Sequence, residues 1–333
     1  LIIRSRIILN DAIVGEAKYP LKQVEELKEY TSADKEIAKI EGRLHSLLKD
    51  LPVTDIQTVE AVLDDVFSKS NLDFRFPVAL SLVNALAEER ATDAAVLLGG
   101  EFLTSVPLPI VDVGWLRGPF EAPIGLLATK PLEDHWFLQP PLAGVTEFAL
   151  DQPQALLESL DEALACHGLL VDLTDVQVDS GVFAFFTQVS DRLHFLMEPE
   201  QLATLGKRSP PNMSEILDRS LLHLSLDELD VFKEQLWPLL PVKSLVLRIP
   251  ASHSLTRVVS EVQQLDDEGF KLVLDSRADT YGSLGLFALA RGLRFRHIWI
   301  SSPLELSLGV VNKANALGRK SQSMVYRPLI EPR

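Results

Sequence analysis

Four short apolar segments in the second half of the chain each end in polar or charged residues. They begin at Leu193, Leu222, Leu245 and Leu272, and sequence with helical spacing lies between most of them. Alternating strands and helices predict a parallel sheet or barrel. In a β/α barrel the carboxyl ends of the strands carry the active site. The pattern therefore predicts such a barrel, with its site at one end.

The length of 333 residues allows one large barrel and a smaller domain. We predict a TIM-like (β/α) barrel over residues 106–310 and an α+β domain over residues 1–105. Residues 310–333 are expected to pack back on that smaller domain. Residues 112–147 are rich in proline and glycine and are expected to form loops over the barrel mouth.

The N-terminal region has the pattern of a β-hairpin followed by helices. Strands are predicted at 2–9 and 12–19, with Asn10 and Asp11 in the turn. Apolar residues at helical spacing follow. They predict helices over residues 35–51, 58–67 and 77–90.

Composition excludes several classes of function. The net charge of −15, without a basic run to offset it, disfavours nucleic-acid binding. No run of about 18 apolar residues is present, so no membrane span is predicted. The single cysteine, Cys166, allows neither an intramolecular disulfide nor a cysteine-rich zinc site. A cytoplasmic location is expected, and monomer and homo-oligomer both stay open.

The order of the segments resembles the enolase superfamily, in its muconate-lactonizing and o-succinylbenzoate synthase branch. Val14-Gly-Glu-Ala followed by Pro20 is similar to the second strand of that family's capping domain. The helix at 76–89, Leu97-Leu-Gly-Gly and the strand at 106–111 follow in family order. The resemblance implies a modified (β/α)7β barrel with an N-terminal capping domain. It also implies proton abstraction next to a carboxylate, with the enolate held on Mg²⁺.

The family's three acidic metal ligands carry over only in part. The first matches Asp172, with Asp175 as an alternative register, and the third matches Asp227. The second is occupied by Met197, with Glu198 one position along and on the other face of the strand. Mg²⁺ needs several oxygen ligands, so the resemblance implies weakly bound Mg²⁺ or none.

The family's lysines are missing. The lysine-x-lysine strand matches residues 146–148, where Glu147 is the candidate replacement, and the far lysine matches Arg248. Arginine stays protonated at neutral pH and cannot act as a base. His223 lies in an alternating strand pattern, either as a base or ligand or as a hydrogen-bonded interior residue.

The segment from Asp275 to Tyr281 matches a ligand-binding loop of the family. Within it, the candidate substrate-binding residues are Asp275, Ser276, Arg277 and Asp279. Arg277 and Arg248 either clamp a carboxylate or phosphate, or form an ion-pair network with the aspartates.

Three functions follow from these residues. The first is an enolase-superfamily relative without its catalysis, kept to bind a small carboxylate or a protein partner. The second is a divergent Mg²⁺-dependent o-succinylbenzoate synthase of menaquinone synthesis. The third is a degenerate cyclic-di-GMP-binding barrel, because residues 222–301 resemble phosphodiesterases of the EAL type.

Overall fold

The computed structural model describes most of the first 300 residues of the chain. The described residues are 2–9, 12–20, 30–49, 51, 56–100, 106–118, 123–129, 145–147, 149, 151–166, 168–177, 185, 188, 193–208, 213–276 and 283–300. The chain divides into two compact units. The first comprises Leu1–Leu103, Ile249–Leu265 and Ala278–Leu293, and the second Thr104–Arg248, Asp266–Arg277 and Arg294–Arg333. The predicted domain boundary between residues 105 and 106 stays a prediction.

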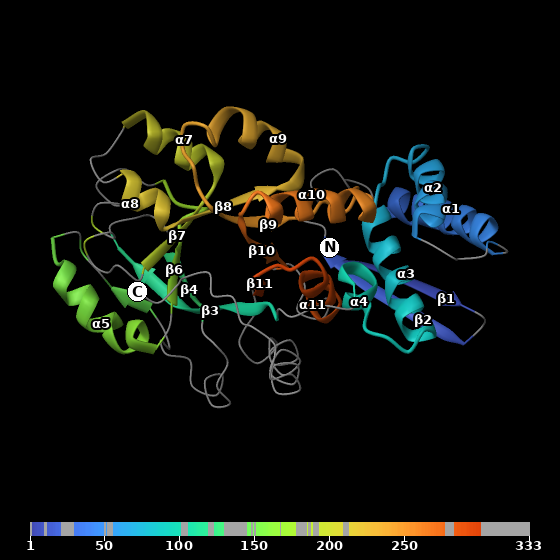
Figure 1. Ribbon diagram of the computed structural model, residues 1–333, viewed down its shortest axis with the longest axis horizontal. Coiled ribbons are helices and arrows are strands. Elements are labelled where there is room, and N and C mark those ends of the chain that lie inside the picture. The colour runs from blue at the N-terminus through green and yellow to red at the C-terminus, as the bar shows by residue number, and fades with distance from the viewer. Residues whose placement is uncertain are drawn as a thin grey trace. The chain divides into compact units, whose positions relative to one another are not determined.

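The first unit contains a hairpin and a set of helices. Strands β1 and β2 pair antiparallel, and helix α3 lies along them (Figure 1). The elements are β1 (Ile2–Leu9), β2 (Ile13–Pro20), α1 (Tyr30–Leu48), α2 (Ile56–Phe67), α3 (Arg75–Glu89), α4 (Ala94–Gly99) and α11 (Ser283–Gly292). Helix α10 (Leu255–Asp267) belongs to this unit over most of its length. The predicted hairpin and the three predicted helices are confirmed, although helix α1 begins and ends earlier than predicted.

The second unit contains a closed barrel of eight strands within a mixed α/β fold. Neighbouring strands around the ring are β3, β4, β6, β7, β8, β9, β10 and β11, and β11 pairs with β3 to close it. Their bounds are β3 (Leu108–Arg117), β4 (Ile124–Thr129), β6 (Gly168–Asp172), β7 (Leu193–Met197), β8 (Ser220–Ser225), β9 (Ser244–Arg248), β10 (Lys271–Asp275) and β11 (His297–Ile300). Strands β6 to β11 run parallel, as their sequence predicts.

Helices lie outside these strands in Figure 1. They are α5 (Pro153–Cys166), α7 (Pro199–Arg208) and α8 (Met213–Asp218). Three consecutive short helical segments follow β8: the 3-10 helix η2 (Leu226–Glu228), α9 (Leu229–Val231) and the π-helical η3 (Phe232–Leu236). Within the described ranges, no helix combines the length and the apolar character needed to cross a membrane.

The expectation that residues 112–147 form loops over the mouth is wrong for much of this segment. It supplies the end of β3 and the whole of β4, which runs antiparallel to both of its ring neighbours. It also supplies β5 (Val145–Glu147), which pairs with β3 and lies outside the closed ring. Strand β3 ends at Arg117 and β4 begins at Ile124. So short a connection is possible between antiparallel strands, whereas a parallel pair needs a long crossover.

Candidate functional site

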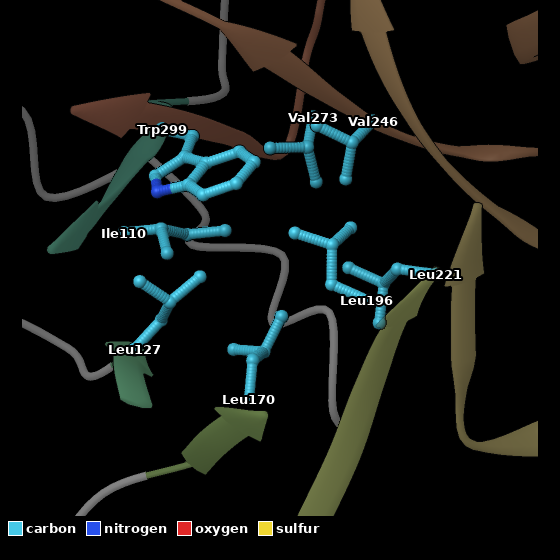
Figure 2. Close-up of a cluster of buried hydrophobic side chains, with 8 residues drawn as sticks. All are labelled: Ile110, Leu127, Leu170, Leu196, Leu221, Val246, Val273 and Trp299. Atoms are coloured by element: carbon cyan, nitrogen blue, oxygen red, sulfur yellow. The ribbon is translucent and has the colours of Figure 1, made fainter. Parts of the chain in front are cut away.

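The barrel interior shows which side chain of each strand points inward. One buried apolar side chain from every ring strand meets in a single cluster (Figure 2). The eight are Ile110, Leu127, Leu170, Leu196, Leu221, Val246, Val273 and Trp299. Side chains alternate between the two faces of a strand, so residues two positions away from these face inward as well. The cluster therefore shows, for every ring strand, which alternate residues face the barrel interior.

Polar residues lie on the inward face one step closer to the carboxyl ends of the strands. On β6, β8, β9 and β10, respectively, they are Asp172, His223, Arg248 and Asp275. All four are predicted site residues. The phase and the strand order therefore bring them to the same end of the barrel, on strands β6 to β10. This end is where β/α barrels build their sites.

His223 and Asp275 form a buried pair across strand β9. The His223 Nε2 and Asp275 Oδ2 atoms are 2.8 Å apart, and the side chains are only 5% and 3% exposed. The imidazole also meets the indole of Trp299 edge to face, with ring centroids 6.1 Å apart. His223 is therefore a hydrogen-bonded interior residue, and its role as a base or ligand stays a prediction. Its nitrogen facing Asp275 is engaged in that contact.

Arg248 lies between these two residues in strand order and is half-buried. It pairs in register with Ser225 on β8. The nearest inward carboxylate on β10, Asp275, bonds to His223 instead. No hydrogen bond or ion pair joins the Arg248 guanidinium to another residue of the described chain. The other members of the predicted ion-pair network, Arg277 and Asp279, lie outside the described residues, so that network stays a prediction.

The three carboxylates matched to the metal ligands are not gathered together. Asp172 Oδ1 accepts hydrogen bonds from the Thr174 backbone nitrogen (3.1 Å) and hydroxyl (2.7 Å). Glu198 is exposed just beyond β7, and Asp227 is exposed on the short helix η2. In the described ranges, no group of three or more His, Cys, Asp or Glu residues is placed to hold a metal ion.

The phase of β7 corrects one detail of the predicted ligand set. Leu196 points into the barrel, so Met197 points outward, where it is fully buried. Glu198, the first residue after β7, lies two positions beyond Leu196 and therefore falls on the inward face. The expectation that the Met197 position faces the site, with Glu198 on the other face, is therefore wrong.

The remaining predicted residues lie elsewhere. Glu147 is exposed on β5. The predicted strand is confirmed over residues 145–147 and pairs with β3, but it is not one of the eight strands of the closed ring. The Ser276 hydroxyl donates to the carbonyl oxygen of Trp299 at 2.6 Å, which extends the pairing of β10 with β11. Arg277 and Asp279 lie outside the described residues.

Sequence reasoning missed Trp115 as a site residue. Its indole is 51% exposed near the end of β3, and Gly125 on β4 is its register partner. A β-bulge between Asp112 and Gly114 shifts the strand phase, so that Trp115 shares a face with Asp172 rather than pointing away from it. The sequence offers one signal, a tryptophan that follows the strand-like run at 106–111, inside the Pro/Gly-rich segment.

The buried His223–Asp275 pair gives a testable stability prediction. A charge-assisted hydrogen bond contributes roughly 1.5–3 kcal/mol. In a double-mutant cycle with His223→Gln and Asp275→Asn, we expect a coupling free energy of that size from urea unfolding at pH 7. The exposed Arg257–Glu261 pair on α10 is the control and should couple by less than about 0.5 kcal/mol. Equal coupling in both pairs would contradict the assignment.

The class that fold and site define is a mixed α/β protein with a closed eight-strand barrel and a polar inward layer at its carboxyl end. No protein-family model matches the chain. The comparison with curated proteins also found no match.

Proposed function

We propose that this protein binds a small carboxylate through Arg248 at the carboxyl end of its barrel and does not catalyse the metal-dependent reaction of the enolase superfamily. The observation that carries the proposal is the half-buried Arg248 on the inward face, with its nearest inward carboxylate engaged by His223. A guanidinium presents a planar set of donors that matches a carboxylate in a two-point contact.

The proposal includes a fold and a relationship. The barrel is a modified TIM barrel of the enolase-superfamily type, and residues 1–105 are its capping domain. A barrel of this type would have to include the antiparallel strand β4. Loss of catalysis is supported by the residues themselves, because positions 146–148 carry no lysine and position 248 carries an arginine. Neither replacement restores a base with the lysine's chemistry.

The test is titration calorimetry with succinate and benzoate. We expect Arg248→Gln to weaken binding about ten- to a hundredfold, because a lost charge-assisted contact of about 1.4–2.8 kcal/mol corresponds to that range. Arg248→Lys should recover only part of the affinity, since an ammonium cannot form the planar two-point contact. The control, Lys243→Gln, removes the same charge next to the opposite end of β9, where the side chain is exposed.

Three outcomes would count against the proposal. Carboxylate binding that survives Arg248→Gln would place the ligand elsewhere. Mg²⁺-dependent dehydration of 2-succinyl-6-hydroxy-2,4-cyclohexadiene-1-carboxylate, abolished by Asp227→Ala and by a chelator, would make the protein a divergent o-succinylbenzoate synthase. Specific binding of cyclic di-GMP, added to the same titration series, would favour the relationship with EAL-type barrels instead.

A further inference from the structure

Trp115, Gly125 and Asp172 are neighbours across three adjacent strands. Trp115 on β3 pairs with Gly125 on β4, and Gly125 pairs with Asp172 on β6. Asp172 is on the inward face, two residues beyond the buried Leu170. The bulge in β3 brings the Trp115 side chain to this face. β-Bulges often re-aim a side chain at the rim of a barrel.

The glycine leaves a gap between the indole and the carboxylate. A Cβ atom added to Gly125 would lie 3.9 Å from Trp115 Cζ3 and 3.9 Å from Asp172 Oδ2. The same atom would lie 3.3 Å from Asp172 Cβ, which is tight. The aromatic ring and the carboxylate oxygen therefore border one position above Gly125, where even a methyl group would be in contact with both, and no side chain separates them.

The carboxylate beside this gap is held in place. Asp172 Oδ1 accepts two hydrogen bonds from Thr174, which orient the group. Its other oxygen, Oδ2, is the one nearest the Gly125 position, and Asp172 is only half-buried. A tryptophan face attracts a cation through its quadrupole, and a nearby carboxylate adds direct charge attraction. Anions are disfavoured there by the same carboxylate.

We propose that Trp115, Gly125 and Asp172 form a binding subsite for an organic ammonium group. The ammonium lies against the indole ring and faces Asp172 Oδ2, above the backbone of Gly125. None of these residues belongs to the proposed carboxylate contact of Arg248, so the subsite stands independently of that contact.

The probe is choline, compared with its neutral isostere 3,3-dimethylbutan-1-ol, in calorimetry or saturation-transfer NMR with the full chain. We expect choline to bind with a dissociation constant of about a millimolar and the isostere to bind at least about tenfold more weakly. Trp115→Leu and Asp172→Asn should each weaken choline binding at least about fivefold, and Trp115→Phe should retain part of it.

Gly125→Ala is the sharpest variant, because it leaves both recognition groups in place and puts a methyl group in the gap. It should abolish choline binding, and because the added Cβ atom lies tight against Asp172 Cβ, the thermal unfolding midpoint is measured in parallel to separate a loss of binding from a loss of folding. Asp218→Asn removes an exposed carboxylate of helix α8 and serves as the charge control. Arg248→Gln removes a positive charge from the same end of the barrel, so this variant should bind choline no more weakly than the parent, which keeps this result separate from the carboxylate titrations.

Three results would overturn the subsite. They are no choline binding at tens of millimolar, equal affinity of parent and Trp115→Leu, and equal affinity for choline and its neutral isostere. The last result would mean that an apolar contact, rather than the charge, drives binding.

Discussion

Replacing Gly15 with alanine is expected to destabilise the first unit by more than about 3 kcal/mol, the upper end of what overpacking usually costs. A Cβ atom at this position on β2 would lie 2.0 Å from the Ser81 carbonyl oxygen and 2.3 Å from the Ala85 nitrogen. Both atoms belong to the backbone of α3, so no rotamer change can make room. The strand would have to move off the helix.

Polar contacts make that movement costly. The Ser5 and Ser81 hydroxyl oxygens are 2.6 Å apart, and Asn84 Nδ2 donates to the Glu16 carbonyl oxygen at 2.8 Å. Both contacts join the hairpin to α3 and would stretch if β2 were displaced. The resemblance singled out Gly15 as part of a family motif. Its close approach to α3 gives a physical reason why glycine is required there.

Urea and thermal unfolding, followed by circular dichroism, test the prediction. The matched control is Gly42→Ala on α1, where an added Cβ meets nothing within 4 Å. That variant should be stabilised by up to about 1 kcal/mol, because alanine is the better helix former. If both variants unfold at the parent's midpoint, the close packing of β2 on α3 is wrong.

The sequence could predict strands β6 to β11 because each is a short apolar run bounded by polar residues or turn signals. It could not predict β4. Its run, Ile124-Gly-Leu-Leu-Ala-Thr, is also apolar, but a buried strand carries no signal of its direction and lies between segments rich in proline and glycine. Reading 112–147 as loops followed from that composition alone.

Site residues on the inward face could be predicted from their places at strand ends, whereas their contacts could not. The His223–Asp275 contact joins residues 52 positions apart in sequence, and it depends on the order of strands around the ring. The inward orientation of Trp115 depends on a single extra residue in β3. Without the bulge between Asp112 and Gly114, strand alternation would turn its indole to the opposite face. Nothing local in the sequence marks that shift.

The last prediction concerns His297, on the inward phase of β11. The side chain is only 1% exposed, and its Nδ1 atom has no hydrogen-bond partner among the described residues. Burial, with a smaller contribution from the neighbouring positive charge of Arg296, lowers the pKa of His297 from 6.5 to about 3. The imidazole is therefore neutral in the folded protein throughout the range from pH 7 to pH 4.

The sign of the pH effect follows from this pKa. Below pH 6.5 the unfolded chain takes up a proton at this histidine and the folded protein does not, so acid favours unfolding. Between pH 7 and pH 5 the free energy of unfolding should fall by about 2 kcal/mol on account of this group. The loss continues as the pH falls toward about 3, where the folded form also becomes protonated.

The measurement is urea unfolding at pH 7 and pH 5 for the parent and for His297→Leu. Leucine has no proton to bind, so the variant should lose about 2 kcal/mol less than the parent over this range, whatever its own stability at pH 7. His45→Gln, at an exposed position on α1, is the control and should keep the parent's pH dependence. Identical pH dependence in the parent and His297→Leu would show that this imidazole is accessible to protons, and would contradict its burial inside the closed barrel.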